Sequence, residues 1–367
     1  MRVAVDITSL HDTRTGVGAF TAEVLSRLAT APGVECVAFS VSWRGRGDVP
    51  AAVPAGVRVA TRPMAARPLR ELWRRTDLAP IEWWTGPVDV VLGPNYVVPP
   101  ARRAGRVAVV HDLTPWRFPE LCTRDTLQYP GLVGRAVATG AHVLTDTHAV
   151  ADEIRATLAV PDERLHVAHL GPPADGPAGD AARGVATAGG PYVLVLGTIE
   201  PRKDHPTVIG AFDRLAVDRP DLRLVLAGQD GWGADAATAA IAAAAHGDRV
   251  VRTGYVTDQL RADLLAGASV LAHPAVYEGF GLPPLEAMAA GTPVVATDIA
   301  VLREVLGDAA SFVAPRDPDA MAAALARVID DDAYAADLVA RGRARAAGYS
   351  WDAAAEGVLA ALRAASS

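Results

Sequence analysis

The stretch that decides the fold is Ala275-Val-Tyr-Glu-Gly-Phe-Gly-Leu-Pro-Pro-Leu-Glu-Ala-Met-Ala-Ala-Gly-Thr-Pro-Val-Val295. It follows the apolar run 269–274 and passes through a glycine-rich turn. The pattern predicts a strand, a loop and a helix from about Pro284 to Ala290, which should end at Gly291. Residues 292–296 are then the next buried strand. The remainder of the chain is interpreted around this strand, loop and helix.

Two glutamates flank the turn: Glu278 precedes it, and Glu286 is expected in the first turn of the helix. Gly279 and Gly281 allow the loop to expose several backbone N–H groups to one anionic or hydroxyl-rich ligand. Each carboxylate can accept hydroxyl hydrogen bonds while the amides hold phosphate oxygens. The alternative is that both glutamates are solvated charges, with Glu286 favouring the helix dipole.

The string 278–295 resembles the Glu-seven-Glu signature of the retaining, nucleotide-sugar-dependent glycosyltransferases of family four, which have the GT-B fold. The resemblance covers nearly the whole chain, is strongest from Gly254 to Val295 and weakest between Arg44 and Trp84. It implies an α/β protein with two Rossmann-like, doubly wound parallel-sheet domains facing a cleft. It also implies transfer of a hexose such as mannose from a nucleoside-diphosphate sugar to a glycan or lipid-linked acceptor. The implied reaction retains the anomeric configuration and uses neither a metal ion nor a cofactor other than the donor.

Strands that alternate with helical stretches independently favour doubly wound parallel sheets. Residues 1–170 form the first predicted domain, on the acceptor side. The Gly- and Pro-rich stretch 171–184 is the predicted linker, and 185–348 form the second, nucleotide-sugar-binding domain. The last segment, 349–367, resembles the family's C-terminal helix that crosses back onto the first domain.

In the first domain, Gly16-Val-Gly18 precedes an amphipathic stretch and predicts a phosphate-cradling loop at a helix start. A plain turn is the alternative, and a dinucleotide-binding fingerprint would need a third glycine and a shorter distance from the strand. His111 follows an apolar strand, where open α/β sheets place ligands, although a lone histidine there can be structural. The resemblance assigns Gly16 and Gly18 to the donor's diphosphate and the acceptor, and makes His111 the active-site histidine.

In the second domain, Arg202 and Lys203 lie at a helix entry and can offer two cations to a diphosphate. Gly197-Thr-Ile-Glu-Pro-Arg-Lys203 resembles a variant of the family's diphosphate-binding segment. The common form has an arginine directly after the glycine, where this chain has Thr198. Part of the positive charge is therefore expected from Arg202. The alternative is a solvated surface pair.

The resemblance completes the predicted donor site. It places Tyr255 and Val256 against the nucleotide base, for which ordinary strand-end packing is the alternative. The motif residues expected to contact the donor are Gly279, Phe280, Gly281, Leu282 and Glu286. Glu286 is expected to bind the ribose, and Glu278 the transferred sugar as a catalytic residue.

The composition limits the partners and the location. The 367 residues carry 42 acidic and 35 basic side chains, a net charge of −7, with no basic run of the kind that binds nucleic acid. The two cysteines favour a reducing compartment, and we expect neither a signal peptide nor a spanning segment of about 20 apolar residues. The prediction is a cytoplasmic protein. Residues 67–84, rich in Arg and Trp, predict either an ordinary packed helix or contact with the cytoplasmic face of a membrane.

The sequence allows two alternative functions. A catalytically inactive sugar-nucleotide-binding protein on the same scaffold is favoured by Thr198. It is disfavoured by the joint presence of Glu278, Glu286, His111 and Lys203. A nicotinamide-dependent dehydrogenase is disfavoured by the incomplete glycine fingerprint.

Overall fold

The computed structural model describes residues 1–11, 16–43, 51, 53–173 and 176–367. The chain forms two compact units: the first is Met1–Leu170 with Trp351–Ser367, and the second is Gly171–Ser350. The predicted linker 171–184 thus lies in the second unit, and its residues 174–175 are outside the described residues. Its end is helical, because the Asp180 carboxylate caps helix α7 by accepting from the amides of Ala182 and Arg183, at 3.0 and 3.3 Å.

The first unit is built on a sheet of seven described strands in the order β3-β2-β1-β4-β5-β6-β7, and all neighbouring pairs are parallel. The inner strands are continuous apolar runs, as expected for a parallel sheet covered on both faces. The strands are β1 (Arg2–Asp6), β2 (Glu35–Phe39), β3 (Arg58–Ala60), β4 (Val90–Gly93), β5 (Gly105–Val109), β6 (His142–Thr145) and β7 (Leu165–Val167).

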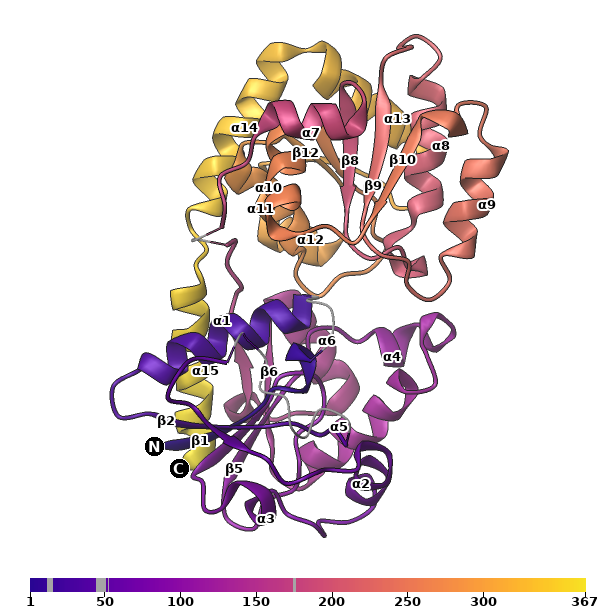
Figure 1. Cartoon of the computed structure of the whole chain (residues 1–367). Helices are drawn as coiled ribbons and strands as arrows, with labels where there is room; N and C mark the ends of the chain where they lie inside the picture. Colours follow the sequence, from indigo (N-terminus) through magenta and orange to yellow (C-terminus); the bar gives the residue numbers. More distant parts are fainter. Residues whose placement is uncertain (12–15, 44–50, 52, 174–175) are drawn as a thin grey trace. The chain divides into compact units, whose positions relative to one another are not determined.

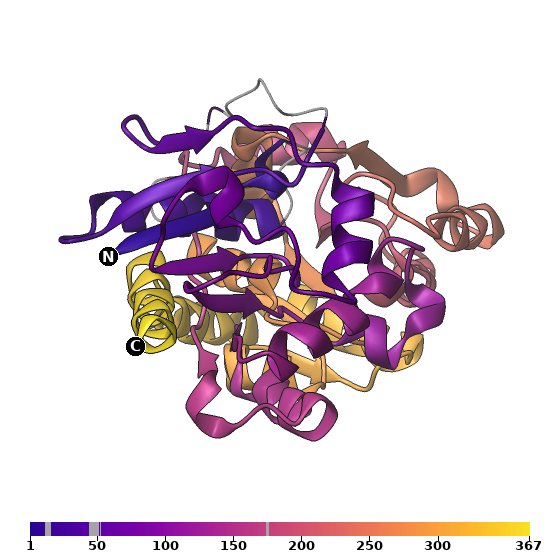
Figure 2. The ribbon, with the colours of Figure 1, turned by 90° about the horizontal axis from the view of Figure 1, so that it is seen from below.

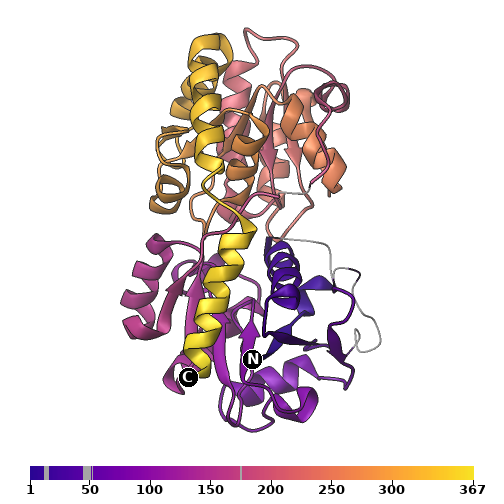
Figure 3. The ribbon, with the colours of Figure 1, turned by 90° about the vertical axis from the view of Figure 1, so that its left-hand side faces the viewer.

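The helices of the first unit include one from the far end of the chain. Helix α15 packs on α1 and β5, and Trp351 at its start is buried. Both chain ends belong to this unit (Figures 2 and 3), with the Ser366 hydroxyl 3.7 Å from Sδ of Met1. The segment predicted at 349–367 is helical only from Trp351. Its first two residues belong to the second unit. The helices are α1 (Gly16–Thr30), α2 (Ala66–Trp73), α3 (Glu82–Thr85), α4 (Thr114–Arg117), α5 (Tyr129–Ala138), α6 (His148–Leu158) and α15 (Trp351–Ser366).

The second unit has six described strands, all parallel, in the order β10-β9-β8-β11-β12-β13. Figure 1 shows α8 and α9 on one side of this sheet and α10 and α11 on the other. The strands are β8 (Tyr192–Leu196), β9 (Arg223–Ala227), β10 (Val250–Gly254), β11 (Val270–His273), β12 (Val294–Thr297) and β13 (Ser311–Val313). The helices are α7 (Ala181–Ala188), α8 (His205–Leu215), α9 (Asp235–Ala243), α10 (Asp258–Gly267), α11 (Leu282–Ala290), α12 (Ala300–Leu306), α13 (Pro318–Asp330) and α14 (Asp332–Ala346).

The prediction of an α/β protein with two doubly wound parallel sheets is confirmed. In each sheet the chain adds strands outward in one direction and then returns to add strands on the other side. The direction changes between β1 and β4 in the first unit and between β8 and β11 in the second. Ligands of open α/β sheets bind outside the carboxyl ends of the strands at such switch points. Among the described helices, none combines the length and apolar character needed to span a bilayer.

Candidate functional site

The switch point of the second unit brings together the two segments that carry its sequence motifs. Residues 197–204 leave the carboxyl end of β8, and residues 274–281 leave that of the neighbouring β11. A hydrogen bond from Val276 N to Arg202 O, 3.0 Å long, joins the two loops directly. Segments more than 70 residues apart in the chain therefore form one polar cluster at the predicted ligand position.

The centre of this cluster is the buried carboxylate of Glu278. Arg202 Nη1 donates to Glu278 Oε2 at 2.8 Å and also to the carbonyl of Tyr277 at 2.8 Å. Lys203 Nζ donates to Glu278 Oε1, and His273 Nε2 lies 3.1 Å from the same oxygen. Arg202 is held further by Glu200, whose Oε1 accepts from Nη2 at 2.7 Å. Both oxygens of Glu278 are thus engaged, and the predicted partners Arg202, Lys203 and Glu278 contact one another.

The charges in this cluster set its protonation states. Burial raises the pKa of Glu278, but the cations Arg202 and Lys203 outweigh burial and hold this pKa well below its ordinary range. Burial lowers the pKa of His273. Burial, with Lys203 nearby, lowers the pKa of His205 to about 4, and its buried Nδ1 has no hydrogen-bond partner among the described residues. At neutral pH the cluster therefore holds an ionised glutamate, two cations and two neutral histidines.

The predicted position of Glu286 in the first turn of its helix is wrong. Helix α11 starts at Leu282, after Gly281 in the left-handed region at φ +97°, so that Glu286 is the fifth residue of the helix. Pro283 and Pro284 are accepted because they lie in the first turn, where backbone N–H groups have no intrahelical partner. Glu286 is buried, and its Oε1 is 3.3 Å from Arg261 Nη1 of α10. Glu286 thus interacts with a cation on the neighbouring helix α10, and it does not lie at the N-terminal end of α11, where the helix dipole would favour its charge.

The other predicted donor residues lie in different environments. Phe280 is buried, with its ring edge-to-face on Tyr349 at 5.8 Å, and Gly279 is also buried. Gly281 is required sterically, because a Cβ there would be 2.7 Å from Leu302 Cδ2. Tyr255 is half-exposed after β10, and Val256 follows it at intermediate burial. The roles of these residues, and of Leu282, stay predictions.

Thr198 and the two cations lie in the loop after β8. A Cβ on Gly231 would be 2.7 Å from the Thr198 methyl group, so this side chain packs against the loop that follows β9. Arg202 and Lys203 belong to a short 3₁₀ turn, Pro201–Lys203, which ends just before α8. Asp204, in the left-handed region, separates this turn from the helix. The cations thus precede the helix, as the sequence predicted.

In the first unit, His111 lies two residues beyond β5. Its Nδ1 is 2.7 Å from Asp146 Oδ2, and its Nε2 is 2.9 Å from the carbonyl oxygen of Pro94. Burial lowers the pKa of His111, but the Asp146 carboxylate outweighs it and raises the pKa. Both ring nitrogens therefore face acceptors, and the protonated ring donates to both. In this arrangement His111 can supply positive charge but cannot accept a proton. Its catalytic role stays a prediction.

The predicted glycine loop is connected to His111 through helix α1. Gly16 opens α1 and Gly18 is buried within its first turn, while residues 12–15 lie outside the described residues. Phe20 of the same helix packs edge-to-face on the His111 ring, with 5.1 Å between ring centroids. A Cβ on Gly16 would meet nothing within 4 Å, so local packing does not explain a glycine there. Phosphate binding by this loop stays a prediction.

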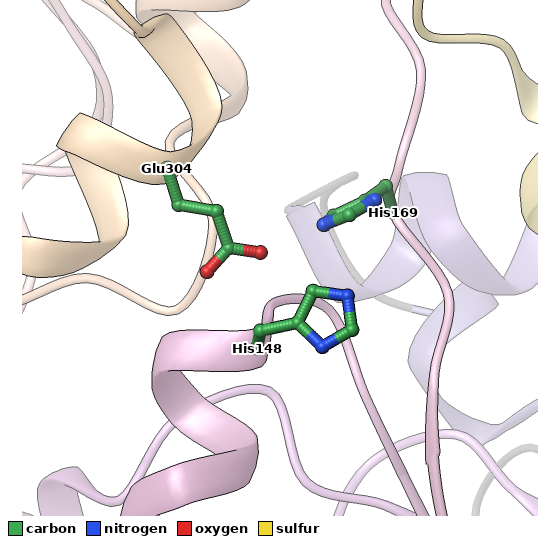
Figure 4. Close-up of side chains that lie close together, drawn as sticks. All are labelled: His148, His169 and Glu304. Carbon is green, nitrogen blue, oxygen red and sulfur yellow. The ribbon is translucent and has the colours of Figure 1, made fainter.

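Two further histidines of the first unit, His148 and His169, are drawn in Figure 4 together with Glu304 of the second unit. The rings of His148 and His169 meet edge-to-face with 5.5 Å between their centroids. Two imidazoles do not make a structural metal site, which takes four ligands for zinc. The expected absence of a metal in the reaction stays a prediction.

The segment 67–84 contains a helix whose apolar side is packed inside. Trp73 of α2 is buried, and its Nε1 donates to the carbonyl of Ala79 at 3.2 Å. On the outer side, Glu71 pairs with Arg74 at 2.9 Å and with Arg75 at 2.5 Å. Trp83 is half-exposed. Contact of this segment with a membrane stays a prediction.

Sequence reasoning missed several members of these clusters. Glu200 stands inside the quoted motif, and His273 is a polar residue at the end of an otherwise apolar strand, which is a usable signal. His205 and Arg261 carry no local signal, because only packing brings His205 near His273 and Arg261 to Glu286. Helix α6 is capped by Thr147, whose hydroxyl accepts from Val150 N at 3.2 Å. Asp146 is thereby left to pair with His111.

Comparison with known proteins identifies the class of protein to which the chain belongs. The model of the family described as glycosyl transferases group 1 matches residues 182–345. The O-antigen chain mannosyltransferase B of Escherichia coli is 31% identical over 268 residues, which cover 71% of this chain and 70% of that protein. The MMP alpha-(1->4)-mannosyltransferase of Mycolicibacterium hassiacum is 32% identical over 245 residues, 64% of this chain and 54% of that protein. The chain belongs to the glycosyl transferases group 1 family.

Solved structures extend the likeness over the whole chain. Sucrose-phosphate synthase from Thermosynechococcus elongatus superposes with a TM-score of 0.77 at 19% identity, covering 99% of this chain and 98% of that one. WaaG, a glycosyltransferase involved in lipopolysaccharide biosynthesis, gives 0.73 at 18% identity, with 98% of each chain covered. These structural neighbours are GT-B glycosyltransferases, and the predicted GT-B fold is confirmed.

Proposed function

We propose that the protein is a retaining glycosyltransferase of family four, with mannose as the first candidate for the transferred hexose. It takes the hexose from a nucleoside-diphosphate sugar and gives it to a glycan or lipid-linked acceptor in polysaccharide biosynthesis. The mannosyltransferases among its relatives support this choice of sugar. The proposal includes a cytoplasmic location, with contact to the cytoplasmic face of a membrane through residues 67–84.

The observation that carries this proposal is the ionised Glu278 held between Arg202 and Lys203 at the switch point of the second unit. The departing diphosphate gains negative charge in the transition state. Cations already fixed at that position stabilise it without reorganisation of solvent. In this proposal Lys203 and Arg202 face the diphosphate, and the amides of Gly279–Leu282 and the Thr198 loop assist them. These groups replace the metal ion that many phosphate-transferring sites use, and no further cofactor is needed.

The remaining roles follow from the matched motif. Glu286 accepts the ribose hydroxyls, and Glu278 accepts hydroxyls of the transferred sugar. Tyr255 and Val256 lie against the base. In the first unit, Gly16 and Gly18 are assigned to the donor, and the protonated His111 contributes positive charge to the reacting centre. Selection of the acceptor is assigned to the first unit.

The test starts from a panel of GDP- and UDP-sugars, with binding followed by thermal shift and turnover by release of labelled sugar. A ligand that binds only the native state raises its melting temperature by mass action. A charge-assisted phosphate contact contributes about 1.5–3 kcal/mol, so Lys203→Ala should weaken binding of the matched nucleoside diphosphate roughly ten-fold or more. Arg214→Ala is the matched control, because Arg214 pairs with Asp319 on the surface. Unchanged binding by Lys203→Ala would refute the assignment.

The anomeric configuration of the product, read by NMR, tests retention separately. Product with inverted configuration would contradict the retaining mechanism while leaving the donor site intact. The alternative of an inactive sugar-nucleotide-binding protein rests on Thr198. It predicts a thermal shift with a matched donor but no sugar release with any donor of the panel.

A further inference from the structure

The first unit has its own switch point, between β1 and β4. The predicted glycine loop with Gly16 and Gly18 follows β1, but no role was predicted for the residues at the two strand ends. Asp6 is the last residue of β1, and Asn95 and Tyr96 follow β4. This is the position at which open α/β sheets bind ligands. The cations that the proposed function assigns to the donor diphosphate, Arg202 and Lys203, belong to the second unit.

Arg70 of α2 brings a positive charge near this edge, because it acts electrostatically on Asp6. Its Nε is buried and has no hydrogen-bond partner among the residues that the structure describes. The neighbouring arginines of the helix differ, since Arg74 and Arg75 both pair with Glu71. A buried guanidinium nitrogen without a partner is costly, and such groups are normally paired. An anion that accepts from this nitrogen would remove the cost.

Contacts with α5 place the residues that follow Arg70 in the chain. A Cβ on Gly131 of α5 would be 3.0 Å from Arg74 Cδ, one turn after Arg70. Arg135 of α5 pairs with Asp77, just beyond α2, at 2.8 Å. The C-terminal end of α2 thus lies beside α5. Burial raises the pKa of Tyr129, the first residue of α5, and the charge of Arg70 acts in the opposite direction.

Tyr129 is held by a second tyrosine in an uncommon backbone conformation. The ring of Tyr96 stacks on that of Tyr129 with centroids 4.7 Å apart, and Tyr96 has φ +58°. The Tyr96 hydroxyl donates to Asp112 Oδ1 at 2.9 Å, and its amide donates to the carbonyl of Val109 at 2.8 Å. A non-glycine residue in the left-handed region persists where its surroundings fix it, and such residues cluster at ligand sites.

Asp6 supplies an acceptor at the same edge. It is buried, and its Oδ1 accepts from the amide of Thr8 at 2.8 Å and from the Thr8 hydroxyl. Burial raises the pKa of Asp6, and the charges of Arg70 and His11 act in the opposite direction. Arg70 thus acts on Asp6 electrostatically. Among the described residues, the hydrogen bonds of the Asp6 carboxylate come from Thr8. The carboxylate does not satisfy the Nε of Arg70.

We propose that Arg70, with Asp6 and Tyr129 beside it, binds an anionic group of the sugar acceptor, a phosphate or a carboxylate. This inference rests on the proposed function, because it names the class of acceptor for that transfer. The planar guanidinium matches both anions with paired hydrogen bonds. The Asp6 carboxylate and the Tyr129 hydroxyl then receive the acceptor's hydroxyl groups.

The experiment is isothermal titration calorimetry of the full chain with glycerol 1-phosphate, glucuronate and neutral methyl glucoside. Saturating nucleoside diphosphate occupies the cations of the second unit during the titrations. The variant is Arg70→Gln, and the matched control is Arg75→Gln, on the same helix with its side chain 67% exposed. We expect at least one anionic probe to bind the wild-type chain and the control, and Arg70→Gln to bind it at least ten-fold more weakly. The arm that responds distinguishes phosphate from carboxylate.

Equal binding of each anionic probe by Arg70→Gln and the wild-type chain would overturn the proposal. So would wild-type binding of methyl glucoside as tight as that of both anions, or of no anionic probe at all. Should Arg70→Gln fail to fold, Tyr129→Phe removes one hydroxyl at the same place and should weaken the same probe several-fold. Affinity for nucleoside diphosphate should be unchanged in Arg70→Gln. If the wild-type chain did not bind nucleoside diphosphate, the proposed function would be wrong, and this result would not count against the Arg70 site.

Discussion

In the second unit a buried carboxylate, Glu278, has Arg202, Lys203 and His273 as partners. In the first unit the buried Nε of Arg70 has no partner among the residues that the structure describes. Both groups lie near the carboxyl edge of a parallel sheet close to its switch point. The partners of Glu278 come from two short segments, 200–203 and 273–278. The groups around Arg70 come from separate strand ends and helices. The Glu278 cluster is thus assembled from two short segments, whereas the neighbourhood of Arg70 is assembled from dispersed ones.

The largest effect that separates the two sites is expected from Glu278→Ala. This change leaves Arg202 and Lys203 without their shared counter-charge, and breaking a buried ion pair costs about 3–5 kcal/mol. Urea denaturation, with hydrogen exchange to localise the loss to the second unit, measures it. The matched control is Glu200→Ala, because Glu200 is the more exposed partner of Arg202 and should cost less than about 1 kcal/mol. Equal losses for the two variants would show that Glu278 is not the centre of the cluster.

The next effect is the acid sensitivity of the second unit. The folded-state pKa of His205 is about 4 against an ordinary 6.5, because the ring is buried and lies near Lys203. Between these values the unfolded chain binds a proton that the native chain does not. The contribution of the neutral His205 to the free energy of unfolding is therefore complete above pH 6.5, and it falls as the pH drops toward 4. The full difference is about 3 kcal/mol.

The measurement is the urea midpoint as a function of pH for the wild-type chain and His205→Gln. The variant should lose less stability between pH 6.5 and 4, since it has no ring to titrate. His148→Gln, an exposed histidine of the first unit, is the control and should follow the wild-type curve. Identical slopes for wild type and His205→Gln would mean that His205 is not the group that titrates.

The smallest effect has the opposite sign and concerns Arg70. Because its buried Nε lacks a partner within the described part of the chain, Arg70→Gln should leave the free energy of unfolding unchanged or raise it by up to about 1 kcal/mol. Denaturation in the absence of any anion measures this. Arg74→Gln, which removes an arginine paired with Glu71, is the comparison and should not stabilise the protein. A loss above about 2 kcal/mol for Arg70→Gln would show that Arg70 has a structural partner and would remove the contrast between the sites.

Local pattern was enough for the fold and for one of the two sites. Apolar runs that alternate with helical stretches predicted both parallel sheets, because strand and helix periodicities are properties of neighbouring residues. The 278–295 string and the Gly197–Lys203 segment predicted the Glu278 cluster, since each lies at the end of one strand. The error at Glu286 also had a local cause. The sequence pattern predicted a helix start near Pro284, but the helix starts at Leu282, directly after the left-handed Gly281.

Tertiary structure alone decided which partners these residues have. His111 was visible in the sequence, but its state depends on Asp146 and Pro94, which reach it from the ends of two other strands. Arg70 looked like one of several arginines on an amphipathic helix. The structure distinguishes it from Arg74 and Arg75, because these two pair with Glu71 and the buried Nε of Arg70 has no partner among the described residues. Hydrogen-bond partners and burial arise from contacts between distant segments, so they have no signature in the spacing of residues along the chain. The sequence by itself therefore determined the two sheets and the Glu278 motif, and the packing determined which charges are neutralised and which are left for a ligand.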